Sequence, residues 1–190
     1  MGESAKWELR RRVMAARRAV PVAVRQAESA ALAAAALPLE RPGAVCAYWP
    51  VGEEPGSAEL LDSLVRRGCR VLLPLIGPLG PLDWAEYTGA ASLRAGPLGL
   101  REPIGRPLGT TVIATAALVL VPALAVDRRG IRLGRGGGHY DRTLPLARSG
   151  TPLVAIVRDD EVLTSLPAQP HDFPVNAAWT PGRGLFSLPC

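Results

Sequence analysis

Apolar residues along the chain fall into short blocks, separated by stretches in which apolar positions recur with helical spacing. The apolar blocks predict strands, which cover residues 44–51, 70–76, 82–87, 117–124 and 152–157. The helical spacing predicts helices, which cover residues 4–18, 22–37, 57–68 and 138–148. Strands that alternate with helices indicate an α/β fold with a mostly parallel central sheet.

The predicted helix at 57–68 has the clearest boundaries in the chain. Ser57 can cap its N-terminus and Gly68 can end it. Because this helix joins two predicted strands, the three elements form a βαβ unit with parallel strands. The block at 117–124 is the most apolar one, so we expect it at the centre of the sheet.

Two parts of the chain give weaker patterns. Residues 77–109 are rich in Pro and Gly and are expected to be irregular apart from one strand. The end of the chain, from residue 159, is expected to be loop-rich with a short strand near 176–180. We find no internal repeat and no linker, and the length suits one domain over residues 1–190.

A net charge of +5 and a pI near 9.7 favour an anionic partner, either a nucleic acid or a polyanionic metabolite. Nearly all the basic residues are arginines, and Lys6 is the only lysine. The sequence contains no helix-turn-helix, no aromatic RNA-binding pattern and few aromatics, so we expect no nucleic-acid partner. A solvated basic face explains the arginine run in the first helix better, with Lys6 and Arg10 as candidate phosphate contacts.

The cysteines and the N-terminus bear on the compartment. Cys46, Cys69 and Cys190 are an odd number without C-x-x-C spacing, which disfavours a disulfide framework or a zinc cluster. No apolar signal segment precedes Pro21, and no apolar run is long enough to span a bilayer. We therefore expect a cytoplasmic protein without a membrane partner.

The stretch RLGRGGGHYDR, residues 132–142, holds four glycines and three arginines. Backbone N–H groups of such a loop suit a phosphate, and Arg132 and Arg135 add charge. The loop lacks both common nucleotide-binding patterns, so it fits a plain flexible turn equally well. Asp141 could hold Mg²⁺ against phosphates, or could merely place a favourable charge in a first helical turn.

Two further loops follow predicted strands, where parallel sheets collect ligands. Trp49 and Glu54 suit a flat heterocycle that donates N–H groups, such as a pterin or a purine, although a solvated acidic turn is the alternative. His171 and Asp172 lie between prolines, and Asp172 could be a second metal ligand or part of a simple turn.

Taken together and in order, these motifs resemble the 5-formyltetrahydrofolate cyclo-ligases, also called methenyltetrahydrofolate synthetases. The segment VPALAVDRRGIRLGRGGGHYDRTL, residues 121–144, is similar to their central signature. The first helix is similar to a K-x-x-x-R start at Lys6 and Arg10. Further similarities are a Y-x-P-x-x-x-E loop at Tyr48, Pro50 and Glu54, a G-x-x-E-P motif at Gly99, Glu102 and Pro103, and an H-D pair at His171 and Asp172.

The resemblance implies a three-layer α/β domain of the NagB/RpiA/CoA-transferase-like kind. It also implies ATP-dependent cyclisation of 5-formyltetrahydrofolate to 5,10-methenyltetrahydrofolate, with release of ADP and phosphate. In the family's chemistry the formyl oxygen attacks the γ-phosphate, and N10 then attacks the resulting imino-phosphate. The expected partners are ATP, Mg²⁺ and a reduced folate, and the expected state is a monomer or a weak dimer.

The resemblance implies a role for each matching residue. The implied catalytic residues are Lys6, Arg132 and Tyr140. The implied ATP-binding residues are Lys6, Arg10, Arg132, Leu133, Gly134, Arg135, Gly136, Gly137, Gly138 and Tyr140. The implied folate-binding residues are Trp49, Glu54, Arg135, Gly136, Gly138, His139 and Tyr140, and the implied Mg²⁺ ligands are Asp141 and Asp172.

Three residues depart from the family pattern. Arg135 stands where an aromatic residue is frequent, His139 where a tyrosine is frequent, and Glu161 near the place of a glutamine. The alternative that they leave open is a nucleotide- or folate-binding relative with altered or lost catalysis.

Overall fold

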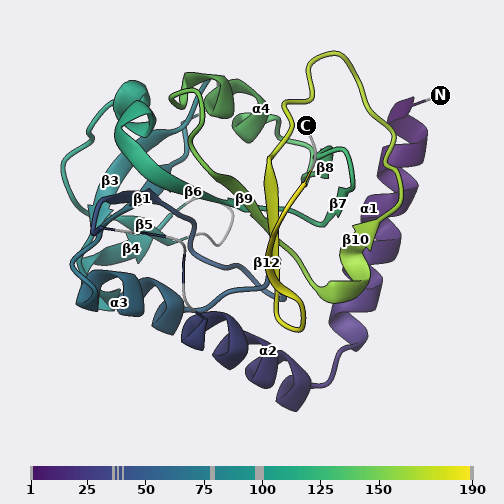
Figure 1. Cartoon of the computed structure of the whole chain (residues 1–190), viewed down its shortest axis with the longest axis horizontal. Coiled ribbons are helices and arrows are strands. Elements are labelled where there is room, and N and C mark those ends of the chain that lie inside the picture. Colours follow the sequence, from purple (N-terminus) through teal and green to yellow (C-terminus); the bar gives the residue numbers. More distant parts are fainter. Residues whose placement is uncertain are drawn as a thin grey trace.

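A central sheet organises the protein, and the computed structural model describes residues 2–35, 37, 39, 41–77, 80–96 and 101–188. The strands of this sheet are β1 Ala44–Cys46, β2 Arg70–Leu75, β3 Asp83–Tyr87, β6 Ala116–Pro122, β9 Leu153–Ile156, β11 Ala177–Thr180 and β12 Gly184–Ser187. They lie in the order β12-β11-β9-β6-β1-β2-β3 (Figure 1). The five inner strands run parallel, and the two edge strands are antiparallel to their neighbours. The mostly parallel sheet and the central place of the most apolar strand are confirmed.

Helices and two small sheets surround the central sheet (Figure 1). The helices are α1 Gly2–Ala19, α2 Val22–Ala34, α3 Ala58–Arg66 and α4 His139–Thr143, and the 3-10 helices are η1 Ala90–Ser92, η3 Thr110–Thr115, η4 Leu144–Leu146 and η5 Asp159–Glu161. A two-stranded sheet joins β4 Leu93–Ala95 to β5 Arg101–Pro103. A three-stranded sheet holds β7 Ala125–Asp127, β8 Arg132–Leu133 and β10 Val162–Leu163.

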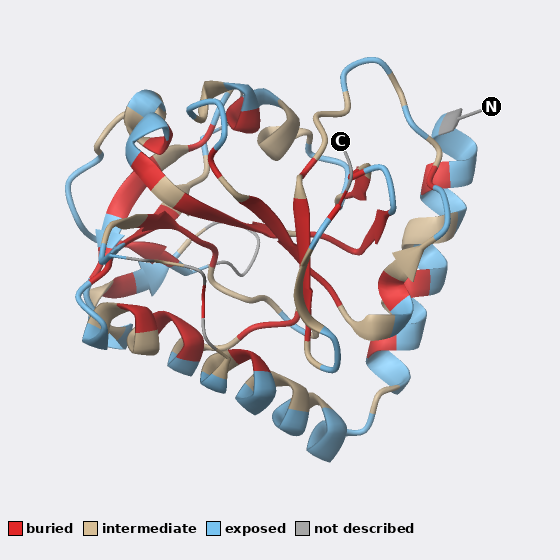
Figure 2. Cartoon of the chain, in the orientation of Figure 1, coloured by how far each residue is buried: buried red, intermediate tan, exposed pale blue. Residues whose placement is uncertain are grey.

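The central sheet is covered on both faces, which gives the three layers. Leu118 and Leu120 of β6 belong to the apolar cluster that α2 and α3 close. Val119 and Val121, the alternate residues of the same strand, belong to the cluster that η3 and η4 close, with Leu144 among its members. Successive side chains of a strand point to opposite faces, so each inner strand supplies both cores, and Figure 2 shows these strands buried along their length.

The first helix packs on the three-stranded sheet rather than on the main one. Val13 of α1 lies in a cluster with Leu124 and Leu133. The same buried face of α1 also carries Lys6 and Arg17, both almost fully buried (Figure 2). A buried charge is costly unless it is paired, so the partners of these two cations fix how α1 docks.

Several boundaries differ from those that the sequence predicts. The first strand ends at Cys46 instead of residue 51, and the second helix ends at Ala34 instead of residue 37. The helix predicted over 138–148 ends at Thr143 and continues as the 3-10 turn η4. Pro145 in that turn has no N–H to donate, which prevents the α-helical bonding from continuing.

Six of the described strands were not predicted. β4 and β5 lie within the region expected to be irregular, and β10 and β12 lie in the end expected to be loop-rich. β7 and β8 have three and two residues and lie between the strand predicted at 117–124 and the helix predicted at 138–148. Such short, partly polar segments have no period that could be detected. The strand expected near 176–180 is confirmed as β11, and Ser57 caps α3 by accepting from the Leu60 N–H.

Arg17 and Glu161 form a buried ion pair that links α1 to η5. Arg17 Nε and Nη2 lie 2.6 and 2.7 Å from the two carboxylate oxygens of Glu161, and both side chains are almost inaccessible to solvent. Arg17 also donates to the carbonyl of Ala123, at 2.7 Å. The pair therefore ties α1 to the turn that follows the central strand β6.

We predict that Glu161→Ala lowers the free energy of unfolding by about 3–5 kcal/mol, because Arg17 stays buried without its carboxylate. Urea denaturation followed by circular dichroism measures this. Glu8→Ala, which removes the exposed partner of Arg11 on the same helix, should change stability little. The double variant Arg17→Met/Glu161→Leu should recover part of the loss, and a Glu161→Ala protein as stable as the wild type would refute the role of the pair.

Candidate active site

A cavity of about 420 Å³ lies at the carboxyl ends of the central strands. Trp49 follows β1, Ile76 follows β2, and Ala123 and Leu124 follow β6, and all four line it. β1 and β6 are neighbours, yet the chain continues from β1 to β2 on one side and from β6 to β9 on the other. Ligands of open parallel sheets bind at such a switch point. The loops that the sequence predicts for ligand binding lie at this edge of the sheet.

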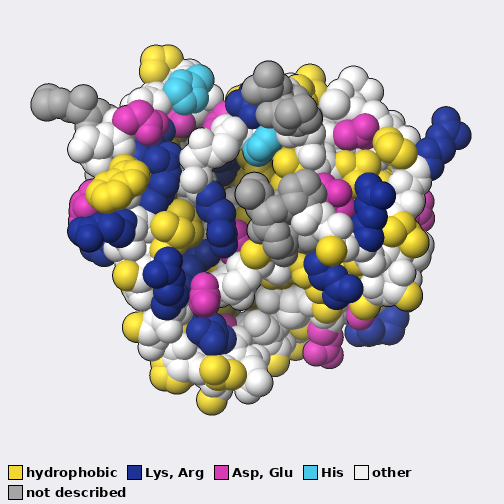
Figure 3. All heavy atoms as spheres, turned by 180° about the vertical axis from the view of Figure 1, so that it is seen from behind, with side chains coloured by type: hydrophobic (Ala, Val, Ile, Leu, Met, Phe, Trp, Pro, Cys, Tyr) yellow, Lys and Arg dark blue, Asp and Glu magenta, His cyan; other side chains and the backbone are white. Residues whose placement is uncertain are grey.

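Basic and acidic side chains surround one end of the cavity. On the face seen in Figure 3, Lys and Arg side chains gather on the side where α1 lies, with acidic side chains between them. The cationic side chains that line the cavity are Lys6, Arg10, Arg101, Arg132 and Arg135. The acidic ones are Glu3, Glu54, Glu102, Asp141 and Asp172.

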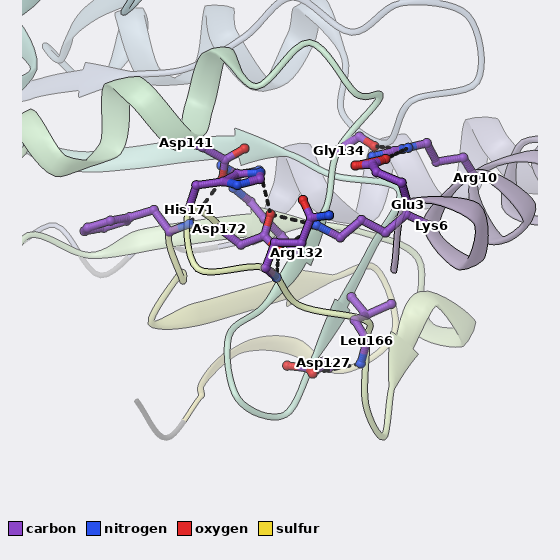
Figure 4. A network of polar contacts seen from close by, with 12 residues as sticks. Glu3, Lys6, Arg10, Asp127, Arg132, Gly134, Asp141, Leu166, His171 and Asp172 are labelled. Carbon is purple, nitrogen blue, oxygen red and sulfur yellow. Dashed lines mark hydrogen bonds and ion pairs between the residues drawn. The ribbon is translucent and has the colours of Figure 1, made fainter. Parts of the chain in front are cut away.

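Lys6 and Arg10 both face the cavity from α1, as their spacing of four residues predicts. Lys6 Nζ lies 2.6 and 2.8 Å from the two carboxylate oxygens of Asp172 (Figure 4). Arg10 donates from Nε to the carbonyl of Gly134 at 3.0 Å and lies 3.6 Å from Glu3. The first helix therefore holds both the glycine-rich loop and the turn that carries Asp172.

The environment of Asp172 favours its charged form. Burial by itself would raise the pKa of this carboxyl group, but hydrogen bonds from Lys6 and from the Gln169 N–H outweigh burial and lower the pKa below its ordinary value of 3.8. Asp172 is therefore a carboxylate at neutral pH, and it is already paired with Lys6.

The glycine-rich loop packs directly against Arg10. Gly136 has φ +105°, in the region that favours glycine, and a Cβ there would lie 3.6 Å from the guanidinium carbon of Arg10. Gly138, with φ +65°, precedes α4. α4 has five residues, so its positive N-terminal end contributes little. The charge for an anion comes mainly from the cations around the loop.

Arg132 is buried behind the loop. Its Nη2 donates to Asp141 Oδ1 at 2.7 Å, and its guanidinium carbon lies 5.9 Å from the ring centroid of Tyr140. Burial lowers the pKa of Arg132, and the neighbouring Asp141 opposes this shift. The Phe173 N–H also donates to Asp141 Oδ1, at 3.2 Å, so the known donors to Asp141 both use one oxygen.

Two polar atoms in the cavity wall lack a partner. Within the described part of the chain, Arg132 Nε and Tyr140 Oη are buried and make no hydrogen bond. Burial raises the pKa of Tyr140 well above its ordinary value, so the phenol stays protonated and can donate. Buried polar atoms are rarely left unpaired, and two donors without acceptors on residues that line one cavity point to an anionic or carbonyl-bearing ligand.

Arg135 and Glu54 close the cavity from two different loops. Arg135 Nε lies 2.8 Å from Glu54 Oε1, and Arg135 Nη2 donates to the carbonyl of Val51 at 3.3 Å. Arg135 is half exposed, whereas the Glu54 carboxylate is mostly shielded and also accepts from the Val51 N–H. The simpler alternative, in which Glu54 belongs to a solvated acidic turn, is therefore wrong.

The other end of the cavity is more apolar. Trp49 lies there with Ile76 and Leu82. The Trp49 ring packs against Tyr87 with a centroid separation of 6.2 Å, and the Arg101 guanidinium carbon lies 5.5 Å from the Trp49 ring centroid. An aromatic platform with a nearby cation suits a planar ring that carries an anionic substituent.

The structure brings all the predicted site residues together. Every residue predicted to bind ATP, folate or Mg²⁺ lines this cavity: Lys6, Arg10, Trp49, Glu54, Arg132, Leu133, Gly134, Arg135, Gly136, Gly137, Gly138, His139, Tyr140, Asp141 and Asp172. His171 lines it too, although its ring is largely exposed. Gly99 of the G-x-x-E-P motif lies outside the described residues.

Several residues around the site were missed by sequence reasoning. Arg101 and Glu102 line the cavity, and the buried Glu102 accepts from the Ile76 N–H at 3.1 Å. The pairing of Arg17 with Glu161 fixes Ala123 beneath the cavity. The G-x-x-E-P match was the available signal for Glu102, whereas the Arg17–Glu161 contact spans most of the chain and has no local signal.

We predict that Lys6→Met raises the pKa of Asp172, because it removes the charge and the hydrogen bonds that lower it. An NMR titration of the Asp172 carboxyl carbon measures this, and Arg12→Met, on the exposed face of the same helix, should leave the pKa unchanged. In the wild type the pair stabilises the fold above pH about 4 and loses this effect as pH falls through the lowered pKa. The difference in stability between the wild type and Lys6→Met should therefore shrink on acidification, and an unshifted Asp172 pKa would contradict the pairing.

Comparisons with known proteins agree with this geometry. A model of the 5-formyltetrahydrofolate cyclo-ligase family matches residues 2–181. A 5-formyltetrahydrofolate cyclo-ligase of Mycolicibacterium smegmatis is 47% identical over 195 residues, which cover 99% of this chain and 100% of that protein. One from Escherichia coli K12 is 32% identical over 127 residues, or 65% of this chain and 70% of that protein.

Solved structures share the fold. The NMR structure of Aquifex aeolicus 5,10-methenyltetrahydrofolate synthetase superimposes with a TM-score of 0.81 at 25% identity, covering 96% of this chain and 92% of that one. A 5,10-methenyltetrahydrofolate synthetase from Mycoplasma pneumoniae gives a TM-score of 0.72 at 17% identity, covering 91% and 96%, and supports the fold alone. The family model, the full-length relative and the fold agree, and the chain belongs to the 5-formyltetrahydrofolate cyclo-ligase family.

Proposed function

We propose that this protein closes the ring of 5-formyltetrahydrofolate, using ATP, to give 5,10-methenyltetrahydrofolate, ADP and phosphate. The observation that carries the proposal is the pair of unpartnered donors, Arg132 Nε and Tyr140 Oη, beside a cluster of cations in a cavity with an aromatic far end. This arrangement matches a substrate pair with a polyphosphate at one end and a planar ring system at the other. Family membership supports both the reaction and the use of ATP.

The phosphates of ATP are assigned to the charged end. Lys6, Arg10 and Arg132 converge there, next to the backbone of the glycine-rich loop. Phosphoryl transfer depends chiefly on positioning and on neutralising charge. Lys6 and Arg132 would leave their carboxylate partners to bind phosphate oxygens, which offer the same charge-assisted hydrogen bonds.

The formyl group is assigned to the neighbourhood of Tyr140. Its phenol stays protonated and has no acceptor among the described residues. A hydrogen bond from it, together with Arg132, would hold the formyl oxygen in line for attack on the γ-phosphorus. The oxygen–phosphorus bond would form as the bond between the γ-phosphorus and ADP breaks. N10 would then attack the formyl carbon, the carbon–oxygen bond would break, and phosphate would leave with the proton that N10 loses. No protein nucleophile takes part, and the Cys46 thiol, whose pKa burial raises to about 12, is not a candidate.

The pterin of the folate is assigned to Glu54 and the outer part of the glycine-rich loop, with Trp49 on the side where the benzoyl ring and its glutamate leave the pterin. Glu54 would accept from ring N–H groups after it leaves Arg135. His139 lines the same cavity and would contact the bound substrate. The bound substrate would thus break the ion pair between Arg135 and Glu54, and each of these side chains would form hydrogen bonds to the substrate instead.

Mg²⁺ is assigned to Asp141 and Asp172. No cluster of three His, Cys, Asp or Glu side chains exists among the described residues, which suits an ion that keeps several waters and binds one or two carboxylates together with phosphates. The donors to Asp141 use Oδ1, so its second oxygen is suited to a metal. When bound, the ion would neutralise phosphate charge, and the two carboxylates would hold it near Lys6 and Arg132.

The domain organisation, the compartment and the oligomeric state are also proposals. The family model covers almost the whole chain, which supports one domain over residues 1–190. Cys46 and Cys69 are both buried and unbridged, which suits a reducing cytoplasm. A monomer or a weak dimer is the expected state. Among the described residues, no helix is long and apolar enough to cross a membrane.

We expect the purified protein, mixed with Mg-ATP and 5-formyltetrahydrofolate, to produce the absorbance of the methenyl product. The product should not form without ATP. Binding of ATP and folate in a calorimeter without turnover would instead support the alternative, a relative with lost catalysis, for which Arg135 and His139 are the motivating residues. Absence of both binding and product would contradict the proposed function.

We also predict that Asp141→Asn sharply lowers turnover, because the variant loses a charged Mg²⁺ ligand and the partner of Arg132. Raising the Mg²⁺ concentration should restore part of the rate, since weaker metal binding is a mass-action effect. Asp160→Asn, at a largely exposed position, is the matched control and should retain full activity. Unchanged turnover and unchanged Mg²⁺ dependence in Asp141→Asn would overturn the metal assignment.

A further inference from the structure

Arg101 differs from the other cations of the cavity. Lys6, Arg10, Arg132 and Arg135 each contact a carboxylate. Within the described residues, the Arg101 guanidinium makes no hydrogen bond or ion pair, and its carbon lies 5.5 Å from the Trp49 ring centroid. An aromatic face holds a guanidinium without occupying its N–H donors, so Arg101 can still bind an anion.

The position of Arg101 separates it from the phosphate end. It begins β5, whereas Lys6 and Arg10 lie on α1, and Figure 1 shows β5 and α1 on opposite sides of the molecule. The cavity reaches from one to the other. A second anionic group that points away from the triphosphate would therefore meet Arg101.

A reduced folate carries such a group. Its reacting formyl nitrogen must lie near the γ-phosphate, and its benzoyl-glutamate tail must leave the cavity in another direction. A second cavity lies beyond Glu54 and is lined by Arg25 and Arg158 as well as by Glu28, Glu53 and Glu59. Arg158 is already paired with Glu28 at 2.7 Å. The carboxylates outnumber the two arginines and so disfavour an anionic tail on that side.

We propose that Arg101 is a specificity-determining residue that binds the glutamate tail of the folate, with Trp49 as the platform beneath it. This inference rests on the proposed function, because it assumes a folate substrate. Glu102, the neighbouring carboxylate, does not neutralise Arg101, since it accepts from the Ile76 N–H and lies 4.0 Å from Arg94. The tail carboxylates then find a cation with free donors at the cavity rim.

The test compares three substrates that share the reacting ring: 5-formyltetrahydropteroate, which has no glutamate, and 5-formyltetrahydrofolate with one or three glutamates. Arg101→Gln should raise the KM of the two glutamylated substrates about fivefold, with little change in kcat, as expected for an exposed charge contact. The KM of the substrate without glutamate should stay unchanged. Arg101→Lys should keep most of the preference, and high salt should weaken the preference of the wild type.

Arg106→Gln is the matched control, because Arg106 is an exposed arginine that follows β5 and does not line the cavity. It should leave all three KM values unchanged. An equal loss on all three substrates, or no loss on any, would overturn the role of Arg101. If the wild type forms product from these substrates, the proposed function stands whichever way the variant behaves, and a wild type that forms none contradicts that function instead.

Discussion

The structure depends on a helix face that is buried although it carries charges. Lys6, Arg10 and Arg17 lie along one side of α1, and Lys6 and Arg17 are almost fully buried. Each needs an acceptor in a low-dielectric setting, and the acceptors come from distant segments: Asp172, the carbonyl of Gly134, and Glu161. The helix satisfies all of them in one placement only, so the packing of α1 also fixes where Lys6 and Arg10 lie in the cavity.

This constraint explains how the charged side chains around the cavity hold its shape. Like-charged side chains around a cavity would repel one another, but four of the five cations alternate with carboxylates that hold them in place. A bound polyphosphate offers equivalent acceptors, and a metal ion offers the carboxylates an equivalent cation. Binding then exchanges ion pairs instead of creating charge in a closed space, which keeps the desolvation cost low.

Much of the fold and site could be predicted because the responsible signals are local. Apolar blocks predict the inner strands, Ser57 caps its helix, and the glycine-rich loop lies where parallel strands end. The resemblance to the family then assigned roles to residues that spacing alone left ambiguous. The misses have physical reasons: β4 and β5 are too short to show a period, Pro145 ends a helix early, and the Arg17–Glu161 pair joins segments that only tertiary packing brings together.

Burial also separates the cavity residues that the fold constrains from those that it leaves free to change. Arg132 and Lys6 are enclosed, and each has a carboxylate at hydrogen-bonding distance, so another side chain there would leave a buried charge unpaired. Arg135 is half exposed and Arg101 is exposed, and solvent can compensate for either if it is replaced. Positions of this kind can change without loss of the fold. The buried residues of the cavity are therefore constrained to the chemistry that the family shares. The exposed residues at the rim are where this chain can set its own substrate preference.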